Sequence, residues 1–172
     1  MKRVLEKTPV IKSNRQPKSL KQLLTRAKFI DQADSCQPKV TKCGHPTCAT
    51  CDNLIEGESF EFKDGPKFRV KTNMTCSSSN LLYVIKCGGC GENYIGQTGM
   101  ELRKRMTVHR QQIRDPSTRM IPLSGHISRC AKNSAKQFHV FPFYKFKDTA
   151  CELERTVKEA EFISKYNPIL NQ

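Results

Sequence analysis

The sequence lacks any apolar run long enough to cross a membrane, and its first residues lack the apolar stretch of a secretory signal peptide. These two absences point away from membrane and secreted proteins, and they predict a cytosolic or nuclear chain without a membrane partner. The sequence also lacks internal repeats and polymerase motifs. These residues therefore carry no recognisable polymerase.

Acidic residues are scarce: the 172 residues include 16 aspartates and glutamates but 30 lysines and arginines, which gives a formal net charge of +14. Such an excess predicts a polyanionic partner, with nucleic acid as the first candidate. The alternative is a basic surface that only keeps the protein soluble. Residues 1–35 hold nine of the basic residues and few acids, and Pro9 and Pro17 interrupt them. This segment is predicted to be a basic linker or arm.

Apolar residues are scarce between residues 36 and 76, so a module there cannot bury enough apolar surface to fold without help. Residues 36–80 are predicted to form a small zinc-binding module. Its middle alternates apolar and polar residues around Asp64-Gly65, which predicts two short strands joined by a turn. The apolar positions of this pattern are Phe60, Phe62, Phe68 and Val70.

Residues 81–172 alternate between strand and helix patterns, which predicts an α+β domain. Two capping boxes are expected, one from Thr98 with Glu101 and one from Thr149 with Glu152. The expected elements are strands at Leu81–Lys86, from Asn93 and at Phe138–Phe146, a helix at Gly99–Arg114, a middle helix, and a last helix ending by Asn167.

Nine cysteines in a chain without a secretory signal are better explained by metal thiolates than by disulfides. Cys43, Cys48 and Cys51 lie close together, and Cys76 follows the predicted hairpin. Three clustered thiolates and a fourth that returns to them suit a tetrahedral zinc site. His45 is an alternative ligand.

A second pair, Cys87 and Cys90, lies in the turn between two predicted strands, separated by two glycines that let the backbone curl. His126 and Cys130 are four residues apart, so one helical face presents both. These four residues predict a second zinc site with three thiolates and one imidazole. A redox pair is the alternative, although a redox motif of this spacing normally enters a helix.

The helix predicted at Gly99–Arg114 places two basic residues where apolar ones are expected. Arg105 and His109 fall in or beside the sector of the core-facing residues Leu102, Met106 and Ile113. Cations on a core-facing side need an anion, a ligand or a cleft to offset desolvation. Three further arginines form a separate stripe on this helix: Arg103, Arg110 and Arg114. This stripe either contacts phosphates of a nucleic acid or is an ordinary solvated face.

The last predicted helix has a similar anomaly, because Glu159 falls among Phe162, Ile163 and Tyr166 on an apolar face. An unpaired carboxylate there is costly. The Glu159 carboxylate is therefore expected either to form a buried ion pair with Arg105 or to bind a divalent metal ion.

These residues, in this order, resemble the motifs of GIY-YIG nucleases. Leu82-Tyr83-Val84 and Tyr94-Ile95-Gly96 are similar to the paired tyrosine motif, although the first has lost its glycine and isoleucine. The segment Leu102–Arg105 resembles the catalytic arginine segment. Glu159 and Asn171 resemble the metal-binding glutamate and the terminal asparagine of the UvrC-like branch. The resemblance covers residues 81–172 and implies a three-stranded antiparallel sheet flanked by helices.

The resemblance also implies a mechanism for DNA hydrolysis. Glu159 would hold one Mg²⁺ or Mn²⁺, and Arg105 would stabilise the transition-state charge. Tyr94 or Tyr83 would position or deprotonate the attacking water, with its phenol acidified by nearby cations. His109 would assist proton transfer or bind phosphate. Asn171 would orient the site.

The presence of cysteines between the two tyrosine motifs resembles the arrangement in the endonuclease of Penelope-like retroelements. Pro17–Phe29 resembles the linker that follows the reverse transcriptase of these elements. The implied partners are DNA and the element RNA, with a nuclear location. A reverse transcriptase domain is expected upstream in the same chain unless it has been lost. Two other functions are considered. One is a non-catalytic, zinc-dependent nucleic-acid-binding module derived from such an element, and the other is a zinc-held protein adaptor.

Overall fold

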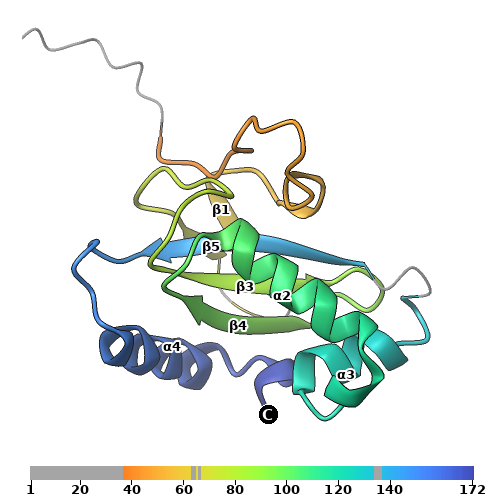
Figure 1. Cartoon of the computed structure of the whole chain (residues 1–172). Helices are drawn as coiled ribbons and strands as arrows, with labels where there is room; N and C mark the ends of the chain where they lie inside the picture. Colours follow the sequence, from red (N-terminus) through yellow and green to blue (C-terminus); the bar gives the residue numbers. More distant parts are fainter. Residues whose placement is uncertain (1–36, 63–64, 66, 134–136) are drawn as a thin grey trace, which may run out of the picture. The chain divides into compact units, whose positions relative to one another are not determined.

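A three-stranded antiparallel sheet in the order β4-β3-β5 lies at the centre of the structure (Figure 1). The computed structural model describes residues 37–62, 65, 67–133 and 137–172, so the predicted arm at residues 1–35 lies outside the described residues. The strands are β3 (Leu81–Cys87), β4 (Asn93–Thr98) and β5 (Phe138–Lys145). Helices α2 (Leu102–Arg114), α3 (Pro122–Arg129) and α4 (Glu152–Tyr166) flank them. The expected α+β class with a three-stranded antiparallel sheet is therefore confirmed.

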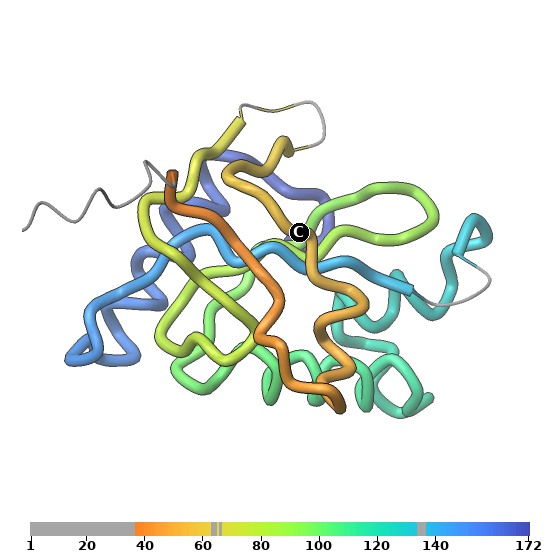
Figure 2. Tube along the Cα trace, turned by 90° about the horizontal axis from the view of Figure 1, so that it is seen from above, coloured from red at the N-terminus to blue at the C-terminus, as the bar shows by residue number. Residues whose placement is uncertain are grey.

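Strand β3 is the most buried part of the fold, since all residues from Leu81 to Ile85 are buried. It hydrogen-bonds to a strand on each side, and both of its faces are covered. Helix α2 covers one face, and a hairpin of β1 (Ser59–Glu61) and β2 (Lys67–Arg69) packs on the opposite side (Figure 2). An uninterrupted apolar run is what a strand with two covered faces requires.

The hairpin confirms the two short strands expected in the cysteine-rich segment. Its aromatic rings pack against the main sheet: Phe60 stacks on Phe141 at 5.4 Å between centroids, and Phe68 meets Phe143 edge-on at 5.2 Å. Gln37–Gln172 form one compact unit with a shared hydrophobic core. The zinc-binding module and the domain predicted after residue 80 therefore do not have separate cores.

The start of α2 differs from the prediction. The helix begins at Leu102, and Thr98 bonds the backbone of Met100 instead of capping the helix. The first free N–H groups of the helix, on Leu102 and Arg103, donate to the carbonyl oxygens of Ser78 and Cys76. The helix is therefore capped by a segment distant in sequence, which a local pattern cannot indicate.

The capping box of α4 also differs, because Cys151 and Glu154 form it instead of Thr149 and Glu152. The end of the helix is as expected: Asn167 adopts a left-handed conformation (φ 43°) directly before Pro168. A short 3-10 turn, η3 (Ile169–Asn171), then returns to β4. Among the described residues, no helix is both long and apolar enough to span a bilayer.

Candidate active site and metal-binding groups

The two motif tyrosines lie on the same face of the sheet, toward α2. Tyr83 pairs with Gly96 across the ladder, and Ile85 pairs with Tyr94. Because side chains alternate along a strand, these positions share a face. A Cβ atom at Gly96 would lie 2.7 Å from the Tyr83 hydroxyl, so only glycine at this position leaves room for that ring.

Tyr83 joins the two unusual basic residues of α2. Its hydroxyl lies 2.8 Å from His109 Nε2 and accepts a hydrogen bond of 3.1 Å from Arg105 Nε. Burial and the charge of Arg105 lower the pKa of His109 to about 3, so the imidazole is neutral at physiological pH. A neutral Nε2 can accept the Tyr83 proton. In the tautomer whose proton is on Nδ1, the hydroxyl donates to His109 while it accepts from Arg105.

The pKa values of both tyrosines contradict the expected acidification by cations. Tyr83 is fully buried, and burial raises its pKa above the usual range, although Arg105 partly opposes this. Burial and the charge of Glu159 raise the pKa of Tyr94. Desolvation therefore outweighs the nearby guanidinium, and both phenols are protonated at neutral pH.

Glu159 is half-buried on α4 and has no ion pair with Arg105 within 4.0 Å among the described residues. The alternative of a buried ion pair between them is not realised. Burial raises the pKa of Glu159, while the Gln97 backbone and the charge of Arg105 partly lower it. The charge of Glu159 in turn raises the pKa values of Tyr83, Tyr94 and Arg105.

Asn171 reaches β4 from the end of the described chain. Its Nδ2 donates to the Ile95 carbonyl oxygen and its Oδ1 accepts from the Ile95 N–H, both at 2.8 Å. The residue therefore holds the outer edge of β4 between Tyr94 and Gly96.

Arg155 is a positioning residue that the sequence reasoning missed. It stands one helical turn before Glu159, and its guanidinium donates to Gln97 Oε1, Asn80 Oδ1 and the Ala150 carbonyl oxygen. These bonds fix α4, and with it Glu159, against the sheet. Its spacing of four residues from Glu159 was the available signal.

The three arginines of the predicted phosphate-binding stripe have different contacts in the structure. Arg103 pairs with Glu101 at 2.7 Å, and Arg114 is exposed. Arg110 instead donates to Thr50 Oγ1 at 3.2 Å and to the Ala49 carbonyl oxygen at 3.5 Å. Arg110 therefore ties α2 to the loop of the first cysteine group.

The first predicted metal group is assembled as expected from Cys43, Cys48, Cys51 and Cys76, whose sulfur atoms all lie within 4.8 Å of one another. Neighbouring sulfurs are 3.5 and 3.6 Å apart. A tetrahedral zinc ion with Zn–S bonds of 2.3 Å needs about 3.8 Å. His45 is exposed and outside this group; it hydrogen-bonds Thr47 instead.

The second group consists of Cys87, Cys90, His126 and Cys130, with Cys90 Sγ 3.1 Å from His126 Nε2. Burial raises the pKa of Cys87, but backbone hydrogen bonds and side-chain hydrogen bonds to His126 and Cys90 together lower it to about 6, which favours the thiolate that a metal needs. Both groups could each hold a zinc ion. All eight described cysteines are free of disulfides.

The two glycines of the second group serve a different purpose from the one expected. Neither has a positive φ; Gly91, after Cys90, does (φ 77°). A Cβ atom at Gly88 would lie 2.9 Å from the Gln137 carbonyl oxygen, and one at Gly89 would clash with the Lys132 carbonyl group. The glycines therefore let the segment after α3 approach the turn closely.

Comparison with known proteins adds no relative: no family model matches the chain, and no curated protein or solved structure shows a significant similarity to it.

Proposed function

We propose that this protein is a metal-dependent endonuclease of the GIY-YIG type that nicks DNA by hydrolysing one phosphodiester bond. The observation that carries the proposal is the convergence of Tyr83, Tyr94, Arg105 and His109 on one face of the sheet, within electrostatic reach of Glu159. A structural core has no need for a neutral histidine, a guanidinium and a carboxylate without an ion pair in one place.

Arg105 is suited to binding the reacting phosphate. Its Nε is occupied by Tyr83, and among the described residues no other hydrogen bond engages its guanidinium. The terminal nitrogens can therefore donate to phosphoryl oxygens as negative charge develops on them. Burial opposes the charge of Arg105, but Tyr83, Tyr94 and Glu159 outweigh it and raise its pKa, so it remains cationic.

Glu159 suits a hard divalent cation such as Mg²⁺ or Mn²⁺. Such ions keep several waters and need only one or two carboxylates together with substrate phosphates, which a single half-buried glutamate can satisfy. A bound ion supplies charge neutralisation at the phosphate and stabilises the departing oxygen. The Gln97 backbone hydrogen-bonds this carboxylate, and Arg155 anchors α4 to the Gln97 side chain.

The two tyrosines are proposed to have different roles. Tyr83 has no exposed surface, so it acts by positioning Arg105 and His109. Tyr94 is partly exposed beside Glu159, so its hydroxyl can hold the attacking water. A protonated phenol orients that water, and deprotonation requires additional positive charge at the site.

Replacing Tyr94 by phenylalanine is expected to lower kcat for nicking by about 100-fold or more, with little change in KM. Tyr83→Phe removes no contact with the water and is expected to cost less while shifting the pH profile, since His109 loses its hydroxyl partner. Single-turnover kinetics from pH 6 to pH 9 measure both effects. The reverse ranking would assign Tyr83 to the water.

The reaction forms a bond between the water oxygen and phosphorus and breaks the bond from phosphorus to the 3′ oxygen. The departing 3′ oxygen takes up a proton, which leaves a 3′-hydroxyl and a 5′-phosphate. A free 3′-hydroxyl is the primer that a reverse transcriptase needs. We propose on this basis that the chain acts in a Penelope-like element in the nucleus, with a reverse transcriptase domain upstream and with DNA and element RNA as partners.

The chemistry of the nick tests this proposal. With one Glu159 and one Tyr94 per chain, supercoiled plasmid should become open circle before linear DNA appears. A DNA polymerase should extend the nick without prior phosphatase treatment. Ends that are extended only after a 3′-phosphate is removed would refute the proposed hydrolysis. Plasmid binding without any nicking would favour the non-catalytic binding module.

A further inference from the structure

The connection between α2 and α3 carries an exposed apolar tip. It contains the short 3-10 turn η2 (Pro116–Thr118) and follows the C-terminal end of α2 (Figure 1). Met120 is 92% exposed, more than any other large apolar side chain in the described part of the chain. Ile121 beside it is 37% exposed. Packing inside this chain therefore does not account for the pair.

Hydrogen bonds hold the backbone of this tip firmly. The Ile121 N–H donates to the Thr118 carbonyl oxygen at 3.0 Å, and Ser124 Oγ donates to the same oxygen at 2.6 Å. A Cβ atom at Gly125 would clash with the Arg119 carbonyl oxygen, so α3 packs closely under the tip. Met120 is therefore presented from a fixed backbone, which lowers the ordering cost of inserting its side chain into a partner.

Two unpaired arginines flank the tip. Arg119 precedes Met120, Arg114 ends α2, and both are exposed. Neither forms an ion pair within 4.0 Å with any residue that the structure describes. The single acidic residue of the connection, Asp115, accepts a hydrogen bond from the Ser117 N–H at 2.9 Å. The tip therefore complements a partner that combines negative charge with an apolar interior.

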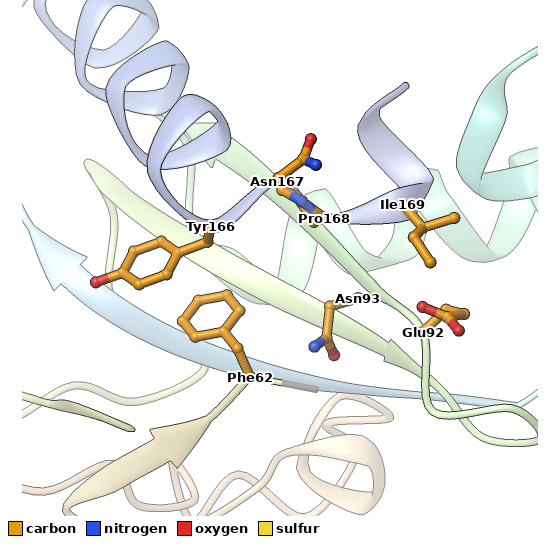
Figure 3. Close-up of a pocket in the computed structure, with 7 residues that line it drawn as sticks. All are labelled: Phe62, Glu92, Asn93, Tyr166, Asn167, Pro168 and Ile169. Carbon is orange, nitrogen blue, oxygen red and sulfur yellow. The ribbon is translucent and has the colours of Figure 1, made fainter. Parts of the chain in front are cut away.

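Other exposed apolar side chains have different neighbours. Leu153 on α4 is 71% exposed, but it stands between Glu152 and Glu154, which repel a polyanion. Ile169 is 58% exposed and lines a pocket of about 250 Å³ together with Phe62 (Figure 3). Ile169 thus belongs to the wall of a pocket, and the charge around Leu153 has the wrong sign for nucleic acid.

Duplex DNA combines apolar base layers with charged phosphates. Proteins that bind the minor groove insert methionine or isoleucine between base steps, while basic residues contact the phosphates. A stable protein interface takes about 20–30 residues on each side, so two adjacent apolar side chains are too few for one. We propose that Met120, supported by Ile121, inserts as a wedge between two base pairs of duplex DNA, with Arg114 and Arg119 on the neighbouring phosphates.

The wedge is separate from the proposed reaction centre. Arg114 lies about 14 Å along α2 from Arg105, at a rise of about 1.5 Å per residue. The proposal rests on DNA as the partner in the proposed function, but it does not depend on the nuclease chemistry.

The linking number of a closed plasmid tests the wedge. A side chain between two base pairs unstacks and untwists them, so a topoisomerase acting on the complex leaves negative supercoils once the protein is removed. The full zinc-loaded chain is mixed with relaxed plasmid and a type IB topoisomerase, which needs no Mg²⁺, and Mg²⁺ is left out to prevent nicking. We expect the topoisomer distribution to shift further as more protein binds.

Four variants separate insertion from phosphate contact. Met120→Ala should lose most of the shift and keep the salt dependence of binding, whereas Met120→Leu should retain both. Arg119→Gln should reduce the slope of log affinity against log salt by about 0.9, the value for one phosphate contact. Met100→Ala, which removes another exposed methionine (47%), should behave as the wild type. Since Met120 is almost fully exposed, Met120→Ala should also keep the wild-type melting temperature.

An equal shift with wild type and Met120→Ala would overturn the proposal, as would no shift from wild-type protein that binds the plasmid. Loss of phosphatidylserine-vesicle binding in Met120→Ala, with an unchanged linking number, would overturn it in favour of a membrane surface. A shift without nicking after Mg²⁺ is added would refute the nuclease and leave the wedge in place. Nicking with an unchanged linking number would refute the wedge alone.

Discussion

Replacing Arg105 by alanine is expected to slow plasmid nicking by about 100- to 1,000-fold, the usual cost of losing one group that stabilises transition-state charge. The Nε of Arg105 is hydrogen-bonded to the Tyr83 hydroxyl, which leaves the terminal nitrogens of the guanidinium available to bind phosphate. Arg105→Lys should recover only part of the rate, since an ammonium group cannot bridge two phosphoryl oxygens. Single-turnover rates with excess enzyme separate this effect from weaker DNA binding.

Two matched variants separate catalysis from structure. Arg103→Ala removes an arginine of the same helix that pairs with Glu101 at the surface, and it should nick at nearly the wild-type rate. Glu159→Gln keeps the shape of the carboxylate but removes its charge, so its nicking rate should fall as that of Arg105→Ala does. Glu161→Gln breaks only an exposed ion pair with Lys158, so its nicking rate should stay near that of the wild type. Wild-type nicking by folded Arg105→Ala or Glu159→Gln would remove that residue from the mechanism.

Loss of either zinc ion is expected to unfold much of the described unit. The apparent binding free energy of structural zinc in small modules is roughly 10–16 kcal/mol. This is comparable with the free energy of unfolding of a whole domain, roughly 5–15 kcal/mol. Cys87 ends β3 and Cys90 lies in the turn to β4, while His126 and Cys130 lie at the end of α3. The second group thus ties the sheet to α3. Cys87→Ser should therefore lower the melting temperature and the zinc content together.

The first group is expected to affect the active site as well. The Cys76 carbonyl oxygen accepts from the N–H of Arg103, at the start of the helix that carries Arg105. Arg110 adds a second link to the Cys48–Cys51 loop. Cys48→Ser should therefore lower nicking as well as stability. A module that unfolds alone, with nicking unchanged, would contradict this coupling.

Cys151→Ser is the matched control for both zinc variants. Cys151 is exposed, belongs to neither group, and caps α4 in a way that serine can reproduce. Elemental analysis should find two zinc ions per chain in the wild type and in Cys151→Ser. One zinc ion or none in protein purified without chelator would remove one or both sites.

Much of the fold and the site could be predicted because periodicity and spacing are local properties. The helical period placed Leu102, Met106 and His109 on the buried side of α2, where the structure has them. Burial on both faces explains the apolar run of β3. Ligand spacing grouped the eight candidate metal ligands as the structure does, since a tight turn and one helical face bring such residues together.

Other features depend on contacts between distant segments and could not be read from the sequence. The start of α2 is set by the carbonyl groups of Ser78 and Cys76, so the local capping signal at Thr98 was misleading. The bond from Arg110 to Thr50 joins positions sixty residues apart, so the helical stripe could not reveal that Arg110 contacts the loop of the first cysteine group. The tyrosine pKa values depend on burial, which charge counting alone does not reveal.

The most direct test of the central claim is the fraction of supercoiled plasmid converted to open circle by the zinc-loaded chain with Mg²⁺ added or left out. Leaving the ion out, in place of adding a chelator, keeps the cysteine groups loaded. We expect open circle to accumulate only with Mg²⁺ or Mn²⁺, and to carry extendable 3′-hydroxyl ends. Equal conversion without the ion, or no conversion by folded protein that binds the plasmid, would contradict the assignment as a metal-dependent endonuclease.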